Sequence, residues 1–269
     1  MPRRILGSRR YKLSLQATAF AGDEQATRRA VDRFWASVQS VLDGLGVETE
    51  RLLDEVKRRR RVFFLDTAEH GFNSQCYLIR ECVDETSGDR RLTLKFRHPD
   101  RYVTQDRDMT AWVAHEPGRL EEIVSPPYDS VFTHSTTIGI GPTTEVRRVE
   151  QLLALFPGLA RDLRGTDDDD EVSVVRHYSV REMVLGGGSL VLRPHRTPVP
   201  CELMMWHATD DPTQPVCIEF SYAYGDDDED YRGRVALEAL DALRALHDGL
   251  PEWVDPDPQA KSTLVYGWS

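Results

Sequence analysis

The chain has 269 residues, of which 40% are hydrophobic and 29% are charged, and its formal net charge is -11. This length and composition predict a globular protein with one large β-rich domain or two small ones. The acidic balance argues against general nucleic-acid binding, although much of the acid lies in two runs, 167–171 and 226–230, that we interpret as solvated loops.

Targeting and redox signals are weak in this sequence. No window approaches the roughly 18 uninterrupted apolar residues of a membrane span, and residues 1–4 lack the features of a secretory signal. We therefore expect a cytoplasmic protein with no membrane partner. Cys76, Cys82, Cys201 and Cys217 have neither CxxC spacing nor the density of a disulfide scaffold, which predicts buried, reduced thiols.

The first part of the chain predicts a strand followed by a helical segment. Apolar and polar residues alternate over 10–18, as they do in a half-buried strand. Apolar residues then recur at helical spacing from about 23 to 43, and Gly44 and Gly46 end that pattern. We expect the helical segment to occupy about 23–60, with its basic last residues forming either a helix end or the solvated beginning of a strand.

The middle of the chain is unevenly patterned. Two antiparallel strands are predicted at 75–82 and 91–97, joined by a polar stretch with the composition of a hairpin loop. The stretch of about 99–142 reads as an irregular insertion, with short strands near 101–103 and 130–140.

The last part of the chain combines strands with two helices. One helix is predicted at 146–156 and a second, amphipathic one at 235–247. Between and after them, β-type patterns occupy 172–185, 190–192, 201–208, 216–224 and 261–266.

Strand segments outnumber helices about two to one, and no regular strand-helix alternation is present. We therefore predict an α+β fold in which a single domain spans 1–269. Its centre is an antiparallel β-sheet flanked by helices. Such a sheet can close into a barrel or tunnel whose inward positions alternate along each strand.

The lysines are scarce and unusually placed. Only Lys12, Lys57, Lys95 and Lys261 occur, against thirty arginines, and three of the four lie on β-type motifs. An ammonium that faces into a closed sheet is a compact charge suited to phosphate oxygens. Lys95 and Arg97 are two residues apart on one predicted strand, so their side chains should share a face.

Several motifs occur in an order that suggests a known family. Phe64-Leu65-Asp66-Thr67, Tyr77-Leu78-Ile79-Arg80 and Leu92-Thr93-Leu94-Lys95 follow one another, and an acid-containing strand around Glu219 and a late Lys261-Ser262 come afterwards. This arrangement resembles the CYTH, or triphosphate tunnel metalloenzyme, superfamily. That superfamily includes inorganic, thiamine and RNA triphosphatases and class IV adenylate cyclases. The resemblance implies a β-tunnel that binds a triphosphate with a divalent metal.

The chain departs from the family pattern at the metal motif. The family opens with ExExK on its first strand, and aligning that lysine with Lys12 places Ser8 and Arg10 where the two glutamates would stand. The late strand keeps Glu219 but has Ser221 where a second acid would face the same side. In the LRxR motif, Arg80 matches one arginine only. The sequence thus resembles a divergent member.

The resemblance and the strand alternation together imply a basic tunnel. Carboxylates that remain for Mg2+ or Mn2+ are Glu219 and Glu202, with Asp106 or Asp108 as further candidates. The expected ligand-binding residues are Arg10, Lys12, Arg80, Lys95, Arg97, Arg107, Arg181 and Lys261.

Three functions follow from this interpretation. In the first, the tunnel binds a triphosphate, polyphosphate or nucleotide-type anion and hydrolyses it with a divalent metal. In the second, it binds a small phosphorylated ligand without turnover, which the loss of the first-strand acids favours. In the third, the fold performs metal-independent chemistry on a small anionic metabolite. The strand aromatics Trp206, Tyr222 and Tyr224 are expected to pack in the core, with base stacking as the alternative role.

Overall fold

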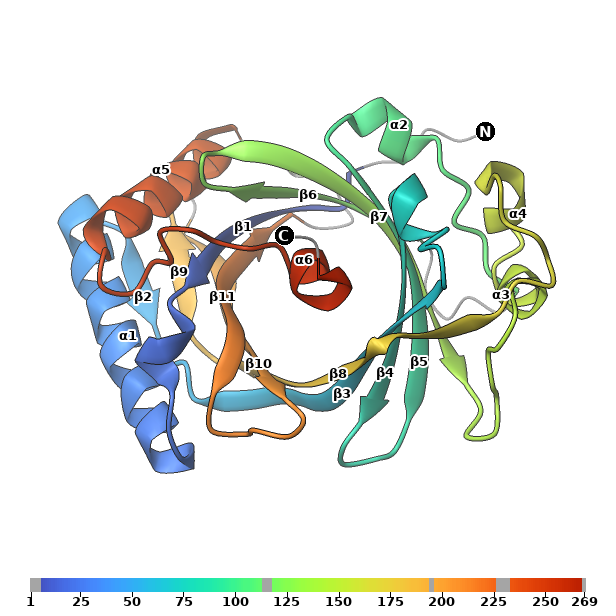
Figure 1. Cartoon of the computed structure of the whole chain (residues 1–269). Helices are drawn as coiled ribbons and strands as arrows, with labels where there is room; N and C mark the ends of the chain where they lie inside the picture. Colours follow the sequence, from blue (N-terminus) through green and yellow to red (C-terminus); the bar gives the residue numbers. More distant parts are fainter. Residues whose placement is uncertain (1–5, 113–117, 194–195, 226–232, 268–269) are drawn as a thin grey trace.

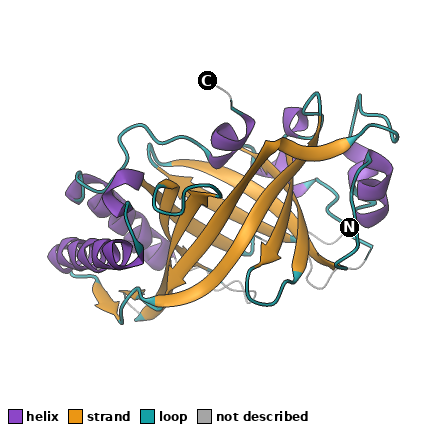
Figure 2. Ribbon diagram, turned by 60° about the horizontal axis from the view of Figure 1, so that its bottom comes forward, coloured by secondary structure: helices purple, strands orange, loops and turns teal. Residues whose placement is uncertain are grey.

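A computed structural model describes residues 6–112, 118–193, 196–225 and 233–267. Within these residues, nine strands form a closed barrel, visible end-on in Figure 1 and from another side in Figure 2. The barrel strands are β1 (Ser8–Leu15), β3 (Glu55–Thr67), β4 (Tyr77–Asp84), β5 (Arg90–His98), β6 (Arg119–Ser125), β7 (Asp129–Ile140), β8 (Val172–Gly186), β10 (Thr197–Ala208) and β11 (Pro215–Tyr224).

The strands follow the order β11-β1-β6-β7-β5-β4-β3-β8-β10, and β10 pairs with β11 to close the ring. The predicted closed sheet is therefore confirmed, but it is mixed rather than purely antiparallel. β1 runs parallel to β6, with Ser8 opposite Glu121, while the other barrel pairs are antiparallel. No short hairpin links β1 to β6, so the chain connection does not force them to be antiparallel.

One outer side of the barrel is covered by the two longest described helices, α1 (Glu24–Leu45) and α5 (Gly233–Gly249), with the short η1 (Ala17–Phe20) (Figure 1). α1 begins where Asp23 accepts a hydrogen bond from the Ala26 amide and ends at the left-handed Gly46. The predicted helical segment to about 60 is therefore too long. Residues 55–60 belong to β3 instead, because their side chains alternate between the two faces of the sheet.

The same side carries a small extension of the sheet. β9 (Ser189–Leu192) pairs with the beginning of β10, and β2 (Glu48–Glu50) pairs with β9. The side chains of α1, α5 and the facing strands form the largest cluster of buried hydrophobic residues, centred on Phe34, Trp35 and Phe220. This core lies outside the barrel, so it fixes the curvature of the sheet without filling its interior.

The other outer side is covered by α2 (Arg101–Gln105), η2 (Asn73–Gln75), α3 (Val149–Leu155) and α4 (Leu159–Asp162). They pack on a second cluster that includes Phe72, Phe96 and Phe156. Within the predicted irregular insertion at 99–142, the strand expected near 130–140 is confirmed as β7, whereas the strand expected near 101–103 is the helix α2. β6 was not predicted, and β6 and β7 both belong to the barrel. β6 was missed because Glu121 and Glu122 are adjacent in its sequence, which interrupts the alternation of apolar and polar residues.

The C-terminal segment 261–266 is a helix, α6 (Lys261–Tyr266), rather than the predicted strand. A closed barrel offers no free edge for a further strand. α6 lies at the opening of the barrel in Figure 1, and Val265 and Tyr266 pack with Val62 and Trp206 in a third buried cluster. The Tyr266 hydroxyl donates a hydrogen bond of 2.9 Å to Asp66.

Asp66, from the motif 64–67, is a structural residue. Its buried carboxylate also accepts hydrogen bonds from the backbone amides of Phe72 and Asn73, at 2.9 and 3.1 Å. It therefore ties the turn after β3 to α6 across about two hundred residues of sequence. This network fixes α6, and with it Lys261, at the barrel opening.

Two smaller predictions have mixed outcomes. Cys82 and Cys201 are buried free thiols and Cys217 is partly buried, but Cys76 is exposed at a turn with a positive φ of 66°. The acidic run 167–171 lies in the loop before β8, whereas 226–230 lies outside the described residues. None of the described helices combines the length and the apolar character needed to span a membrane.

Candidate functional site

The barrel interior contains a cavity of about 260 Å³ with a highly charged lining. Side chains from both halves of the sheet and from α6 contribute to it. Its eight basic residues are Arg10, Lys12, Arg58, Arg60, Arg80, Lys95, Arg97 and Lys261, and its four acidic residues are Glu121, Glu182, Glu202 and Glu219. The remaining wall is largely apolar, with Phe64, Leu78, Met204 and Trp206 among its members.

The structure places the two other predicted ligand-binding residues outside this cavity. Arg181 precedes the inward-facing Glu182 on β8 and so faces outward, where it pairs with Glu85 at 3.3 Å. Arg107 follows α2 and forms an ion pair with Asp162 at 3.6 Å. Its guanidinium lies 4.9 Å from the centre of the Phe96 ring, on the outer face of β5. The prediction that both arginines line the tunnel is therefore wrong.

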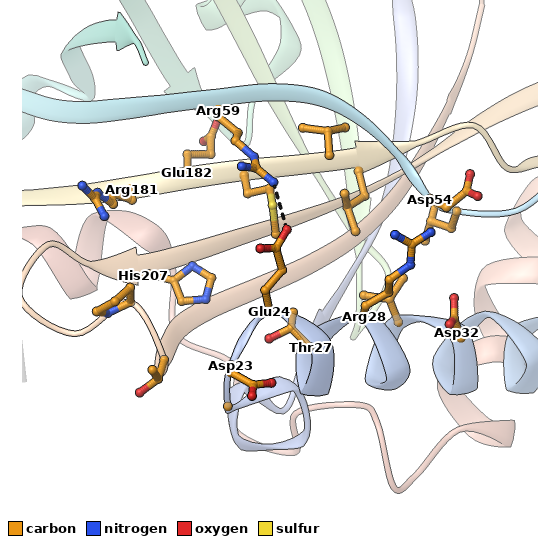
Figure 3. Close-up of a pocket in the computed structure, with 18 of the residues that line it drawn as sticks. Asp23, Glu24, Thr27, Arg28, Asp32, Asp54, Arg59, Arg181, Glu182 and His207 are labelled. Carbon is orange, nitrogen blue, oxygen red and sulfur yellow. Dashed lines mark ion pairs between the residues drawn. The ribbon is translucent and has the colours of Figure 1, made fainter. Parts of the chain in front are cut away.

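Arg181 lines a separate groove of about 460 Å³ between α1 and the outer face of β3 and β8 (Figure 3). The dashed line in that view is the ion pair between Arg59 and Glu24, with 3.6 Å between their charged atoms. Two of the arginines that line this groove are thus already paired with glutamates, and further acids surround them. The groove does not concentrate positive charge as the barrel interior does.

Three basic side chains of the cavity form an unpaired cluster on the adjacent strands β4 and β5. They are Arg80, Lys95 and Arg97, which we call the basic trio. Among the residues that the structure describes, no carboxylate lies within ion-pair distance of any of the three. Lys95 is opposite Leu78 in the β4–β5 ladder, and Arg80 is two residues along, so both point to the same side.

The electrostatic setting of Lys95 is unfavourable for its charge. Burial lowers the pKa of Lys95 to about 7. Nearby Glu121 opposes this shift, while the positive charges of Arg80 and Arg97 add to it. Burial also lowers the pKa of Arg97, which remains charged. The trio therefore holds positive charge that no described side chain neutralises at short range.

On the wall opposite the trio, Glu219 of β11 lies between two lysines. Lys12 Nζ is 2.8 Å from Glu219 Oε1, and Lys261 Nζ is 2.5 Å from Oε2. Burial pushes the pKa of Glu219 upward, but the Lys261 and Lys12 ammonium groups outweigh it and hold the pKa at about 2. Glu219 is accordingly ionised, and both of its oxygens are engaged.

The other three glutamates are engaged in the same way. Glu202 lies between the guanidinium groups of Arg10 and Arg58, at 3.4 and 3.1 Å. Arg10 also contacts Glu121, which accepts a further hydrogen bond from the Ser8 hydroxyl at 3.1 Å. Ser8 and Arg10, which stand where the family pattern has acids, are therefore both inside the barrel and both donate to Glu121.

Glu182 completes the set. Its Oε1 lies 2.6 Å from Arg60 Nη2, and its Oε2 accepts a hydrogen bond of 2.9 Å from the Trp206 indole. Burial is the largest single effect and raises the pKa of Glu182, but the positive charges of Arg60, Arg80 and Lys261 together outweigh it, and the pKa falls to about 2. Each of the four tunnel carboxylates thus faces at least one guanidinium or ammonium group.

This arrangement does not fit the predicted metal site. Mg2+ and Mn2+ need several oxygen ligands turned toward a single point. Glu219 and Glu202 turn their oxygens toward cations instead, and no group of three His, Cys, Asp or Glu side chains among the described residues could hold a metal ion. Asp106 ends α2 and Asp108 bonds to Thr110, both away from the barrel interior.

The sequence did not point to four charged members of the cavity: Arg58, Arg60, Glu121 and Glu182. A signal for the arginines was present, because Arg58, Arg60, Val62 and Phe64 alternate along β3. The two glutamates gave little signal, since one lies in the segment read as irregular and the other follows the outward-facing Arg181.

The strand aromatics have packing roles, as predicted. Trp206 is almost fully buried: Lys261 Nζ lies 5.1 Å from its ring centre, and Phe64 packs against it edge-on at 6.0 Å. Tyr222 stacks on Tyr11 in the outer core with 5.3 Å between ring centres. Tyr222 is therefore a residue of the outer core, whereas Trp206 also forms part of the cavity wall.

No family model matches this chain, and no curated protein matches it. Among solved structures, a candidate adenylyl cyclase from Hippeastrum, described as having a dominant triphosphatase activity, is 13% identical over 95% of each chain, with a TM-score of 0.44. A candidate adenylate cyclase from Vibrio parahaemolyticus is 8% identical over 96% of this chain and 98% of its own, with a TM-score of 0.40.

A third solved structure, a candidate adenylate cyclase from Bacillus halodurans, is 9% identical over 98% of each chain, with a TM-score of 0.42.

Proposed function

We propose that the barrel interior binds a polyphosphate-type anion, such as a triphosphate or the phosphate end of a nucleotide, through the basic trio. The observation that carries this proposal is the short-range isolation of Arg80, Lys95 and Arg97 from acidic side chains in one cavity. Unpaired charge in a poorly solvated cavity is costly, and a bound anion offsets that cost. Charge-assisted hydrogen bonds to phosphate oxygens are also stronger there than at a surface.

The charge balance of the whole cavity supports the same ligand class. Its basic residues outnumber its acidic ones by eight to four, in a protein whose formal net charge is -11. An anion is therefore attracted to the barrel interior and repelled by much of the remaining surface. Guanidinium groups at Arg80 and Arg97 offer the fork of donors that matches phosphate oxygens, and Lys95 adds a compact charge.

The proposal is for binding without a divalent metal. Metal-assisted hydrolysis requires free carboxylates, and the four tunnel glutamates are engaged by basic side chains. A second candidate function is metal-independent chemistry on the bound anion. It is favoured by Lys95, because an amine whose pKa is about 7 can donate or accept a proton near neutral pH.

Calorimetric titration of tripolyphosphate in EDTA tests the binding proposal. We expect the wild-type protein to bind, and Lys95→Ala to weaken binding by about 10- to 100-fold, the value of one charge-assisted contact. Arg181→Ala is the matched control, since it removes a cation from the outer groove and should leave the affinity unchanged.

Phosphate release is measured in the same samples with Mg2+, with Mn2+ and with EDTA. Release that needs a metal would contradict metal-independent binding as the function. Equal affinity in Lys95→Ala and Arg181→Ala would show that the trio is not the binding site.

A further inference from the structure

Glu219 is the tunnel carboxylate that lies between two lysines. It bridges Lys12 on the neighbouring strand β1 and Lys261 on α6, and each of its oxygens contacts one ammonium group. The carboxylate side chain is about 10% exposed, and the two lysine side chains are 20% and 29% exposed. A charged group from the solvent can therefore reach the lysines more easily than it can reach Glu219.

This bridge is electrostatically close to the basic trio. Burial has the largest effect on Arg97 and lowers its pKa, and Glu219 opposes that shift. For Lys95, burial, Glu121 and the two arginines have the larger effects, and the positive charge of Lys261 lowers its pKa further. The trio and the bridge line one cavity. An anion held by the trio and long enough to extend across the cavity would meet Lys12 and Lys261.

We propose that Glu219 is an internal counter-anion, which competes with the ligand for Lys12 and Lys261 and thereby limits the affinity for long polyphosphates. This inference rests on the proposed function and adds a rule for ligand length to it. A short anion that is satisfied by the trio leaves the bridge intact. A longer chain places a phosphate near the bridge, where Glu219 repels it and retains the two lysines.

Neutralising Glu219 should change phosphate affinity in the opposite direction from that expected for a metal ligand. If Glu219 held a divalent metal, its neutralisation would weaken phosphate binding. If it is a counter-anion, neutralisation frees two ammonium groups and removes one repulsive charge. For the one phosphate charge nearest to Glu219, removing that repulsion is worth about tenfold in affinity at an effective dielectric constant of about 20.

The experiment compares Glu219→Gln with wild type in EDTA, using inorganic phosphate, pyrophosphate and tripolyphosphate as probes. We expect the variant to bind tripolyphosphate about tenfold more tightly, and phosphate less than threefold more tightly. Glu85→Gln is the matched control, because it makes the same charge change at the outer ion pair with Arg181 and should alter no affinity.

Several outcomes would overturn the inference. Weaker or Mg2+-dependent binding in Glu219→Gln would make Glu219 a ligand-holding or metal-holding residue. An equal gain for all three probes, or a gain in Glu85→Gln as well, would mean a general charge effect without a length rule. If wild type and Glu219→Gln bind nothing, both this inference and the proposed function fail. If wild type binds tripolyphosphate and Lys95→Ala does not, the proposed function stands, and the result for Glu219→Gln alone decides this inference.

A second variant covers the case in which Glu219→Gln does not fold. Lys261→Met removes one of the two contested cations from α6, where its side chain is 29% exposed. We expect it to weaken tripolyphosphate binding by about tenfold while leaving phosphate binding within threefold of wild type. Unchanged tripolyphosphate binding would show that the ligand does not reach the bridge. Thermal unfolding of each variant verifies that the compared proteins are folded.

Discussion

The two walls of the barrel interior carry similar side chains but differ in how those side chains are paired. On β4 and β5, Arg80, Lys95 and Arg97 have no short-range acidic partner among the described residues. On the facing wall and α6, cations such as Lys12 and Lys261 are bound to Glu219. The comparison shows that an excess of basic residues does not by itself define an anion site. We propose that the anion site is the subset of basic residues that has no carboxylate within ion-pair distance.

The largest expected effect is the loss of protein stability when a paired cation inside the barrel is removed. Arg60→Met would leave Glu182 buried and without its closest cation, so we expect a loss of about 3–5 kcal/mol in the free energy of unfolding. Urea denaturation followed by tryptophan fluorescence measures it. The adjacent Arg59→Met is the control, because its exposed partner Glu24 pairs on the outer face and the loss should stay under about 1 kcal/mol.

Comparable losses in Arg59→Met and Arg60→Met would break the distinction between paired groups inside the barrel and those outside. A small loss in Arg60→Met alone would show that Glu182 finds another cation in the cavity.

Removing an unpaired cation from the barrel interior should have the opposite effect and stabilise the protein. Lys95→Met removes a buried charge that lacks a close partner, so we expect the free energy of unfolding at pH 6 to rise by about 2 kcal/mol. Burial lowers the pKa of Lys95 to about 7 in the folded state, below its unfolded value of about 10.4. The penalty is therefore present in full below pH 7 and fades as the pH rises toward 10.

Urea denaturation of wild type and Lys95→Met at pH 6 and pH 9 tests this prediction. The increase in the free energy of unfolding of the variant over wild type should be larger at pH 6. A destabilised variant would mean that Lys95 has a stabilising partner in solution.

The smallest expected effect is the pH dependence of binding. Below about pH 7 Lys95 carries its charge before the anion arrives, whereas above that pH binding must also take up a proton. We expect tripolyphosphate affinity to fall by about tenfold between pH 6 and pH 8.5, relative to Lys95→Arg, whose guanidinium stays charged throughout.

The Lys95→Arg reference also corrects for protonation of tripolyphosphate itself, which affects both proteins equally. Parallel pH profiles for the two proteins would refute a role for Lys95 ionisation in binding.

The sequence predicted the closed tunnel and several of its basic residues, but it did not predict which of them are paired with acids. Strand alternation placed Lys95 and Arg97 on one face, and the order of motifs indicated a closed β-tunnel. It did not predict that Arg10 would lie against Glu121 and Glu202. Those contacts join β1 to β6, a parallel strand far along the chain, and to β10, which is two strands away around the barrel. Arg107 and Arg181 were misplaced because the face of a strand or loop residue depends on register.

The sequence by itself determined several local periods, such as the helical spacing that begins near Asp23 and ends at Gly46, and the side chains that share a face on β5. Only the tertiary structure decided which charges meet. Glu219 lies 207 residues from Lys12 along the chain. α6 brings Lys261 to the same carboxylate, and it is held there by apolar packing and by the hydrogen bond from Tyr266 to Asp66. Charge interactions depend on distance and burial after the barrel has closed, and neither quantity is encoded in local spacing.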